Sequence, residues 1–355
     1  MSRFYVVGIA GTAKNTGKTT ALTALLTEAE RVGLALGLTS IGYDGEMRDN
    51  ITGLPKPRIH CRAGLIVAIA ESCLTAGSCR IAVLERTSVQ TPLGAIVIGK
   101  ITRPGLLVIA GPNKTRELSH IISRLGKHGA EAVFVDGALN RIAPLAATDG
   151  IILSTGAART TRLEDLAGEA EAIDRLLNRP AVNRGCKNDR IILADGCSST
   201  SLSTGSLLTP GQVTEIMAAF TPATKAVYIP GAVNIELLQR VINSLRGRIR
   251  RLEIIFSNAF NLLIGGEAHD VQAVLEDIER RGGKIAVQRQ TPLLAVTVNP
   301  FYPSYRREGN RYRPSAVDAD ELLTAVRRAV RVPVADVKRD GAASLFAAIR
   351  QRLTL

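Results

Sequence analysis

The segment of residues 4–42 constrains the fold of this chain more than any other part of its sequence. Residues 4–11, FYVVGIAG, form an apolar run, which is typical of a strand buried on both faces of a parallel sheet. A short polar loop ends in Gly-Lys-Thr at residues 17–19, and apolar residues then recur at helical spacing over residues 18–32. Residues 34–42, LALGLTSIG, predict a second strand. The segment therefore predicts a β-α-β unit and places the chain in the α/β class.

The same alternation of strands and helices continues along the rest of the 355 residues. It predicts a doubly wound, mainly parallel sheet as the core, with a second α/β unit. The polar stretch 178–189 contains Pro and Gly and is the best linker candidate, so we expect a first domain over residues 1–180 and a second over residues 190–355. Beyond the first helix, we expect helices at residues 63–77, 115–128, 161–178, 211–220, 233–245, 269–281, 318–330 and 341–353.

The chain is strongly basic, with a formal net charge of +13, and such an excess raises nucleic acid or a membrane surface as partners. The excess is diffuse, because residues 1–150 hold 17 basic and 11 acidic side chains and residues 151–355 hold 28 and 21. The strongest cluster is a short group of arginines within residues 306–313, and no Trp is present to stack on single-stranded bases. These features argue against nucleic acid or a membrane as the main partner.

The cysteines and the N-terminus indicate the compartment. Cys61, Cys73, Cys79, Cys186 and Cys197 include no C-x-x-C pair and are odd in number, which argues against a zinc ribbon and against a disulfide framework. A reducing compartment fits this usage. The N-terminal apolar run is too short for a signal-peptide core, and no apolar stretch reaches the length of a membrane span. We therefore expect a cytoplasmic protein.

The loop between the first strand and the first helix has the composition of a phosphate-binding loop. Its backbone N–H groups form a positive nest, Lys18 can reach β- and γ-phosphate oxygens, and the Thr19 hydroxyl can ligate Mg²⁺. The usual pattern, G-x-x-x-x-G-K-[ST], requires Gly where this chain has Thr12, and the glycine stands one residue earlier at Gly11. The alternative is an ordinary surface turn. The predicted nucleotide-binding residues are Gly11, Thr12, Lys14, Asn15, Thr16, Gly17, Lys18, Thr19 and Thr20.

Two aspartates are predicted to complete the site, because each follows a predicted strand. Asp136 ends the apolar part of residues 131–141, and Asp44 follows the second strand. At the carboxyl edge of a parallel sheet, a carboxylate can hold Mg²⁺ or its waters beside the phosphates. We predict Lys18, Asp44 and Asp136 as catalytic residues, and Thr19, Asp44 and Asp136 as metal ligands. The alternative for each aspartate is a turn or helix cap.

Other charged residues lie near these motifs in the sequence. Lys56 and Arg58 can bring positive charge to a phosphoryl group or to a carboxylate substrate, and Glu46 and Arg141 follow the two predicted aspartates. The alternative for Lys56 and Arg58 is a solvated surface charge, and the alternative for Glu46, as for Asp44, is a solvated turn. The run NKTR at residues 113–116 lacks the acid of an Asn-Lys-x-Asp motif, so guanine specificity is not indicated. ATP and Mg²⁺ are therefore the predicted ligands.

The loop of residues 11–19, GTAKNTGKT, resembles the phosphate loop of dethiobiotin synthetase and the cobyrinate amidases. These enzymes belong to a class of P-loop NTPases that also holds septum-placing ATPases. Asp136-Gly137-Ala138 is similar to the Glu-Gly-Ala-Gly-Gly that ends a strand in that family, although Asp replaces Glu and residues 139 and 140 are not glycines. A Lys-Pro pair, here Lys56-Pro57, also follows the second strand in dethiobiotin synthetase, but lies farther along in this chain. The resemblance implies a P-loop fold and a homodimer.

A narrower resemblance extends over residues 10–158. The runs TGLPKPRI, TPLGAIVIGKI, VDGALNR and ILSTGAA look like those of a P-loop family associated with cobalamin-dependent lysine or ornithine aminomutases, where a member is described as a reactivase subunit. This resemblance implies an ATPase that exchanges damaged cobalamin in an aminomutase partner. The Asp-x-His-x-x-Gly signature of cobalamin binding is absent from the sequence.

Three functions are compatible with these motifs. The leading hypothesis is a Mg-ATPase whose hydrolysis drives a conformational change in a protein partner, with residues 190–355 as the coupling or recognition part. The first alternative is an enzyme that uses ATP to activate a small carboxylate and then closes an amide or a ring. The second is a scaffold that binds the nucleotide without hydrolysing it. Because all three require residues 17–19 to bind phosphate, the loop alone cannot separate them.

Overall fold

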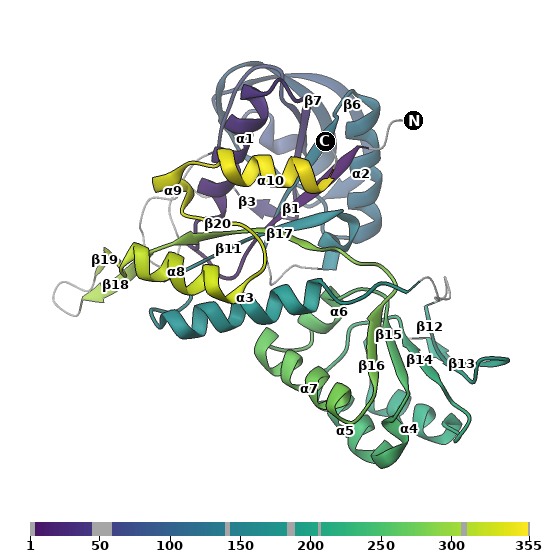
Figure 1. Cartoon of the computed structure of the whole chain (residues 1–355). Coiled ribbons are helices and arrows are strands. Elements are labelled where there is room, and N and C mark those ends of the chain that lie inside the picture. Colours follow the sequence, from purple (N-terminus) through teal and green to yellow (C-terminus); the bar gives the residue numbers. More distant parts are fainter. Residues whose placement is uncertain are drawn as a thin grey trace. The chain divides into compact units, whose positions relative to one another are not determined.

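The apolar runs of the sequence become the strands of two large sheets, and the described residues also form three two-stranded sheets (Figure 1). The structure is a computed structural model that describes residues 4–44, 59–138, 143–182, 189–204, 207–306 and 311–353. The chain divides into two units. The first unit comprises Met1–Ala170 and Leu293–Leu355, and the second comprises Glu171–Pro292.

A mainly parallel sheet of nine strands forms the centre of the first unit, in the order β20-β17-β11-β1-β10-β2-β5-β7-β6. Every neighbouring pair from β20 to β5 is parallel, whereas β7 is antiparallel to both β5 and β6. The strands of this unit are β1 (Tyr5–Gly11), β2 (Leu36–Ser40), β3 (Tyr43–Asp44), β4 (Ile59–Cys61), β5 (Ile66–Ala70), β6 (Arg80–Thr91), β7 (Gly94–Arg103), β8 (Gly105–Leu107), β9 (Ile109–Ala110), β10 (Ala132–Ala138), β11 (Gly150–Gly156), β17 (Leu293–Asn299), β18 (Phe301–Arg306), β19 (Arg311–Ala316) and β20 (Val334–Ala335).

The helices of the first unit pack on this sheet through their apolar sides. In α1, Ala21, Leu22, Leu25 and Ala29 are buried at helical spacing, which explains why the periodic pattern predicted this helix. Helix α1 contacts β1, β2 and β11, whereas α2 contacts β5 and β10. The helical elements are α1 (Lys18–Arg31), η1 (Glu71–Cys73), α2 (Thr115–Lys127), η3 (Ala143–Ala147), α8 (Ala319–Ala329), α9 (Val337–Asp340) and α10 (Ala343–Leu353), and α3 (Leu163–Leu177) begins in this unit and ends in the second.

The second unit has a five-stranded sheet in the order β13-β12-β14-β15-β16. Strands β14, β15 and β16 are parallel, and β12 is antiparallel to both of its neighbours. The hydroxyl-rich stretch after β12 begins with a tight turn, in which Asp195 accepts hydrogen bonds from the backbone N–H groups of Cys197 and Ser198. The elements are β12 (Arg190–Ala194), β13 (Ser199–Thr204), α4 (Pro210–Ala219), β14 (Ala226–Ile229), α5 (Ile235–Leu245), η4 (Arg246–Ile249), β15 (Glu253–Phe256), α6 (Phe260–Leu263), α7 (Ala268–Arg280) and β16 (Lys284–Val287).

The predicted fold class is confirmed: the protein is a mixed α/β protein with a large, mainly parallel sheet and a second α/β unit. The division of the chain differs from the predicted boundaries of 1–180 and 190–355. Residues 293–355 return to the first unit, because β17 pairs with β11 and extends the first sheet. Pairing between strands so far apart in sequence leaves no local signal.

One predicted helix is wrong. Residues 63–77 contain β5, a fully buried strand with the sequence IVAIA, followed by the short turn η1. A short, continuous apolar run is compatible with both a buried strand and a buried helix, and here pairing with β2 and β7 decides for the strand. In the described part of the chain, no helix is long and apolar enough to cross a membrane.

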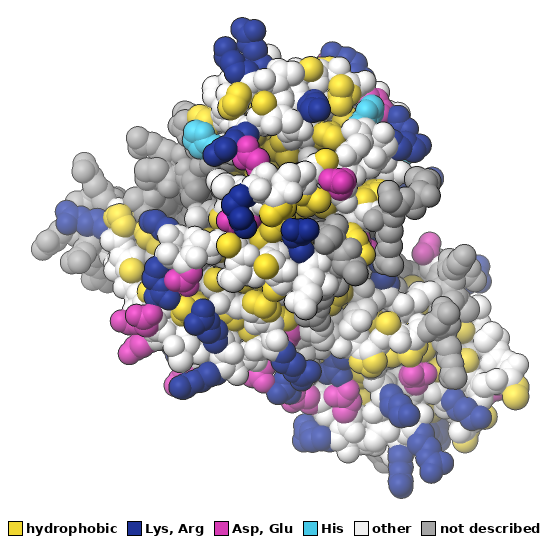
Figure 2. All heavy atoms as spheres, turned by 45° about the horizontal axis from the view of Figure 1, so that its top comes forward, with side chains coloured by type: hydrophobic (Ala, Val, Ile, Leu, Met, Phe, Trp, Pro, Cys, Tyr) yellow, Lys and Arg dark blue, Asp and Glu magenta, His cyan; other side chains and the backbone are white. Residues whose placement is uncertain are grey.

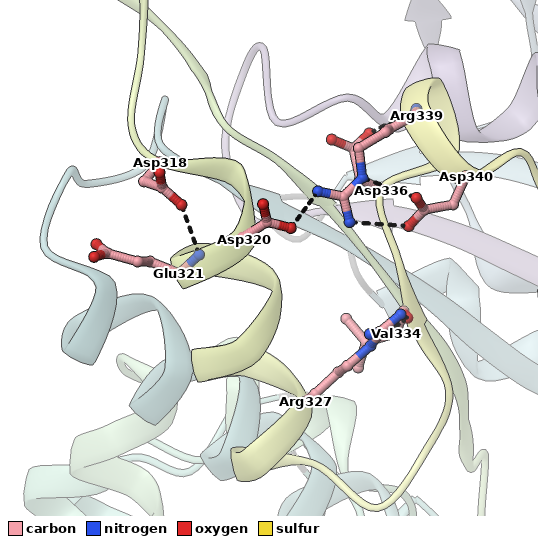
Figure 3. Close-up of polar contacts among 8 residues, drawn as sticks. All are labelled: Asp318, Asp320, Glu321, Arg327, Val334, Asp336, Arg339 and Asp340. Carbon is pink, nitrogen blue, oxygen red and sulfur yellow. Dashed lines mark hydrogen bonds and ion pairs between the residues drawn. The ribbon is translucent and has the colours of Figure 1, made fainter.

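The elements near the C-terminus are joined by a group of polar contacts that we call the Arg339 cluster (Figure 3). The guanidinium of Arg339 donates to Asp320 Oδ1 at 2.7 Å and to Asp340 Oδ1 at 2.8 Å, which joins the start of α8 to α9. Asp336 caps α9 by accepting from Lys338 N at 3.0 Å, and Arg327 donates from α8 to the Val334 carbonyl in β20. These contacts connect α8 with α9 and connect α8 with β20, the edge strand of the large sheet.

Candidate functional site

The loop between β1 and α1 has a backbone that can surround an anion. Asn15 and Gly17 have left-handed backbones, with φ of 65° and 91°. Alternation of right- and left-handed residues turns successive N–H groups toward one point, which is the geometry of an anion-binding nest. Gly17 is the N-cap of α1 and has no side chain, so α1 begins without a side-chain cap. The positive end of the helix dipole therefore lies at this loop.

Lys18, the first residue of α1, pairs with Asp136 on β10. Lys18 Nζ lies 2.8 Å from Asp136 Oδ2, and the Asp136 side chain is only 2% exposed while that of Lys18 is 16% exposed. The pair forms because β1 and β10 are neighbours, with Ile9 opposite Asp136 in the register, and the loop returns α1 over that end of the sheet. Two residues that are 118 positions apart, and that the sequence predicted as partners in one site, are thus in direct contact.

Hydroxyl groups on β11 and β17 extend the site on its other side. Thr12 N donates to the Ser154 carbonyl at 3.0 Å, and Thr12 Oγ1 donates to Thr155 Oγ1 at 3.2 Å. The buried Thr297 donates in turn to Ser154 Oγ at 2.8 Å. Sequence reasoning missed Ser154, Thr155 and Thr297. Hydroxyl residues interrupting apolar strand runs near their carboxyl ends were the available signal.

Asn299, the last residue of β17, was also missed, although it touches the loop directly. Its side-chain Nδ2 donates to the Asn15 carbonyl at 2.9 Å, and its Oδ1 accepts from Phe301 N at 3.3 Å. Its own carbonyl accepts from Ala157 N at 2.9 Å, which fixes it to the end of β11. A Cβ placed on Gly17 would lie 3.1 Å from Asn299 Cβ, so Asn299 also packs against the loop.

The structure describes some of the remaining predicted residues and not others. Thr16 is buried and donates to the Ala13 carbonyl, Lys14 is exposed, and Thr19 and Thr20 lie half-buried in the first turn of α1. Asp44 ends the two-residue strand β3, where its backbone pairs with Ile109; its side chain lies outside the described part of the structure. Four further predicted residues lie outside the described residues altogether: Glu46, Lys56, Arg58 and Arg141.

The cysteines do not form a reactive or metal-binding centre in the described residues. Cys61, Cys73 and Cys79 are buried and Cys197 is exposed. Burial raises the pKa of Cys61 to about 12 and also raises the pKa of Cys73 and of Cys79, so these thiols stay protonated at neutral pH. Among the described side chains, no group of three or more His, Cys, Asp or Glu residues could hold a metal ion.

The positive charge is spread rather than gathered. On the face shown in Figure 2, Lys and Arg side chains lie over both units and are interspersed with Asp and Glu. Basic residues also pair with acids nearby in the sequence, as Arg175 does with Glu171 and Lys114 with Glu117.

The chain was compared with protein families, with curated proteins and with solved structures. No family model matches it, and no curated protein matches it in sequence. Among solved structures, the signal recognition particle receptor FtsY from Elizabethkingia anophelis is similar with a TM-score of 0.24 and 10% identity; the match covers 92% of this chain and 66% of FtsY. A pNOB8 ParA bound to nonspecific DNA is similar with a TM-score of 0.25 and 12% identity, over 79% of this chain and 98% of ParA.

Proposed function

We propose that this chain is a P-loop protein that binds a nucleoside triphosphate at the β1–α1 loop. The observation that carries this proposal is the contact between Lys18 and Asp136 beneath a nest-forming loop at a helix N-terminus. The Lys18 ammonium is neutralised by the Asp136 carboxylate, which lies 2.8 Å away. A triphosphate in the nest would attract the ammonium toward its oxygens, and the Asp136 carboxylate would then face the metal that accompanies the phosphates.

The donor set at the loop fits Mg²⁺. Mg²⁺ prefers oxygen ligands and keeps several of its waters, so a hydroxyl and one carboxylate suffice from the protein. Thr19 supplies the hydroxyl in the first turn of α1, and Asp136 supplies the carboxylate at the end of β10. Asp44 is a third candidate from its place after β2. When bound, Mg²⁺ would offset the charge that develops on the phosphates during hydrolysis.

The more particular proposal is an ATPase of the dethiobiotin-synthetase-like class whose hydrolysis changes the conformation of a protein partner. The loop spacing of residues 11–19 and the acid at the end of β10 support this class. The second unit, Glu171–Pro292, is a separate α/β body with its own sheet, and we assign it the recognition of the partner. A cobalamin-dependent aminomutase is the partner that the narrower sequence resemblance suggests.

The test is ATP binding and hydrolysis by the full chain, with and without candidate aminomutase partners. Lys18→Ala removes the ammonium that would contact phosphate, and we expect the Kd for Mg-ATP to rise about 100-fold. Lys114→Ala, at the exposed lysine that precedes α2, should leave this Kd unchanged. Unchanged Mg-ATP affinity in Lys18→Ala would show that the proposed site is wrong.

Asp136→Asn separates hydrolysis from binding. The substitution keeps the shape of the side chain but removes its charge, so turnover should fall by at least about tenfold while nucleotide binding changes less. Hydrolysis that a protein partner stimulates supports the coupled ATPase. Phosphate release that depends on a small carboxylic acid supports the ligase instead, and tight binding without turnover supports a scaffold.

A further inference from the structure

Asn299 joins the phosphate loop to the hairpin of β18 and β19. One end of its amide donates to the Asn15 carbonyl of the loop, and the other end accepts from the backbone of Phe301, the first residue of the hairpin. A single side chain is thus shared between the candidate phosphate site and an element with no role in it. The two contacts are made by opposite ends of one planar group, so movement at one end turns the other.

On the loop side, Asn299 holds a conformation that the nest requires. Asn15 has φ of 65°, which is uncommon for a residue with a side chain. The Asn15 carbonyl accepts from Asn299 Nδ2 at 2.9 Å, and this hydrogen bond holds the Asn15 backbone in its left-handed conformation. A left-handed residue within such a loop is part of the nest geometry. Asn299 itself is fixed, because its carbonyl accepts from Ala157 and its strand pairs with β11. It therefore acts as a rigid support for the nest.

On the hairpin side, Asn299 contacts the first residue of the hairpin. Strands β18 and β19 form a two-stranded sheet of their own, which Figure 1 shows beside α8, and two-stranded hairpins are marginally stable alone. Pro303 and Pro314 are opposite each other in the register, and neither can donate a ladder hydrogen bond. Two hydrogen bonds lie at the base of the hairpin, where its two strands begin and end. Phe301 N donates to Asn299 Oδ1, and Val317 N donates to the Pro300 carbonyl at 3.0 Å. Loss of one of these two hydrogen bonds should therefore make the whole hairpin less ordered.

The hairpin also presents side chains suited to contact with another molecule. Tyr305 is 52% exposed and pairs with Tyr312 across the strands, with ring centroids 5.3 Å apart. Arg313 is exposed on β19. A change in the order of the hairpin would therefore alter an exposed aromatic and basic surface.

We propose that Asn299 is a positioning residue that couples nucleotide at the phosphate loop to the order of the β18–β19 hairpin. This inference rests on the proposed function, since it requires nucleotide at the loop. A phosphate in the nest fixes the Asn15 peptide, which holds the Asn299 amide in one orientation and keeps Oδ1 facing Phe301 N. The nucleotide state of the site is thereby transmitted to the hairpin.

The coupling is measured by hydrogen–deuterium exchange of the full chain, with and without a non-hydrolysable Mg-ATP analogue. In the wild-type protein, we expect slower exchange at residues 12–19 and about fivefold slower exchange at residues 301–306 and 311–316. In Asn299→Ala, the Kd should rise about 3- to 10-fold, and saturating nucleotide should still protect residues 12–19 but no longer the hairpin. Asn261→Ala removes comparable amide contacts in the second unit and should change neither readout.

A second substitution removes only the hydrogen bond between Asn299 and the hairpin. Phe301→Pro removes the N–H that donates to Asn299 but leaves the Asn299 contact with the loop, so the hairpin response should disappear at unchanged nucleotide affinity. Phe301→Leu, which keeps the N–H and removes the ring, should retain the response. A wild-type hairpin response in Asn299→Ala at saturation overturns the coupling, as does nucleotide protection of residues 12–19 without any hairpin response in the wild-type protein. If residues 12–19 show no nucleotide protection at all, the proposed function itself fails.

Discussion

The Lys18–Asp136 pair and the Arg339 cluster both join distant elements of the first unit through opposite charges, but their surroundings differ. Asp136 is 2% exposed, whereas the partners of Arg339 are 85% exposed at Asp320 and 33% at Asp340. Water and salt screen the exposed charges, and exposed pairs contribute little to stability. Removing one partner of the buried pair leaves a carboxylate that has lost its cation in a poorly solvated place. The same type of contact should therefore contribute little to stability at the exposed Arg339 cluster and much more at the buried Lys18–Asp136 pair.

The largest effect is expected for Lys18→Met. Because the substitution leaves the Asp136 carboxylate without this cation, the free energy of unfolding should fall by about 3 kcal/mol. The measurement is urea unfolding of the purified variant. Lys14→Met, at an exposed lysine of the same loop, is the control and should leave stability nearly unchanged. If the double variant Lys18→Met/Asp136→Asn does not recover part of the loss, the buried carboxylate is not its source.

Gly17→Ala is expected to cost about 2 kcal/mol of unfolding free energy. Gly17 has φ of 91°, and an added Cβ would lie 3.1 Å from Asn299 Cβ. Gly33→Ala provides a matched comparison, because Gly33 has φ of 70° with nothing within 4 Å of an added Cβ. Denaturant unfolding of both variants isolates the contact with Asn299. Equal losses would mean that only backbone strain matters at Gly17.

Glu85→Gln tests a pair of intermediate burial. Glu85 on β6 is 20% exposed and accepts from Arg124 of α2 and from His128, the residue that follows α2. The Arg124 hydrogen bond is the main cause that lowers the pKa of Glu85, against desolvation, and His128 adds to it. We expect a loss of about 1 kcal/mol at pH 7.

The pH dependence of this loss has a defined sign. A carboxyl whose pKa is lower in the folded protein contributes stability above its unfolded pKa, and that contribution disappears as the pH falls through the folded pKa. The difference between wild type and Glu85→Gln should therefore be largest at neutral pH and disappear as the pH falls through the lowered pKa of folded Glu85. Unfolding curves across this range give the answer, with Glu71→Gln at an exposed pair as control. A difference that persists in acid would assign the effect to packing rather than charge.

The smallest effect is expected for Arg339→Ala. Although Asp340 and Asp320 raise the pKa of Arg339, the guanidinium stays charged with or without them, and the contacts are solvated. Its Tm should stay within about 2 °C of the wild-type value. Asp336→Ala in the same cluster should lower Tm more, because Asp336 is buried and caps α9. A larger loss for Arg339→Ala than for Asp336→Ala would contradict the role that we give to burial.

Prediction from sequence succeeded where the signal is local. The loop of residues 11–19, the strand before it and the helix after it are contiguous, and each has its own pattern of apolar residues and glycine. Asp136 could be predicted as a site residue because an acid that ends an apolar strand is visible without knowing the neighbour of that strand; its role stays a prediction, while its contact with Lys18 is observed. Asn299 lacked such a signal, since its partner Asn15 is 284 residues away and nothing near either residue marks the contact.

The sequence by itself determined the α/β class and the glycine-containing loop between β1 and α1, because both depend on residues close together in the chain. Only the tertiary structure decided that residues 63–77 contain a strand, that residues 293–299 join the first sheet beside β11, and that Asn299 supports the loop. The physical reason is that strand order is set by pairing between distant segments, whose free energy depends on which surfaces are buried together. The local pattern of apolar residues predicts whether a segment forms a helix or a strand, but not which distant segment it pairs with.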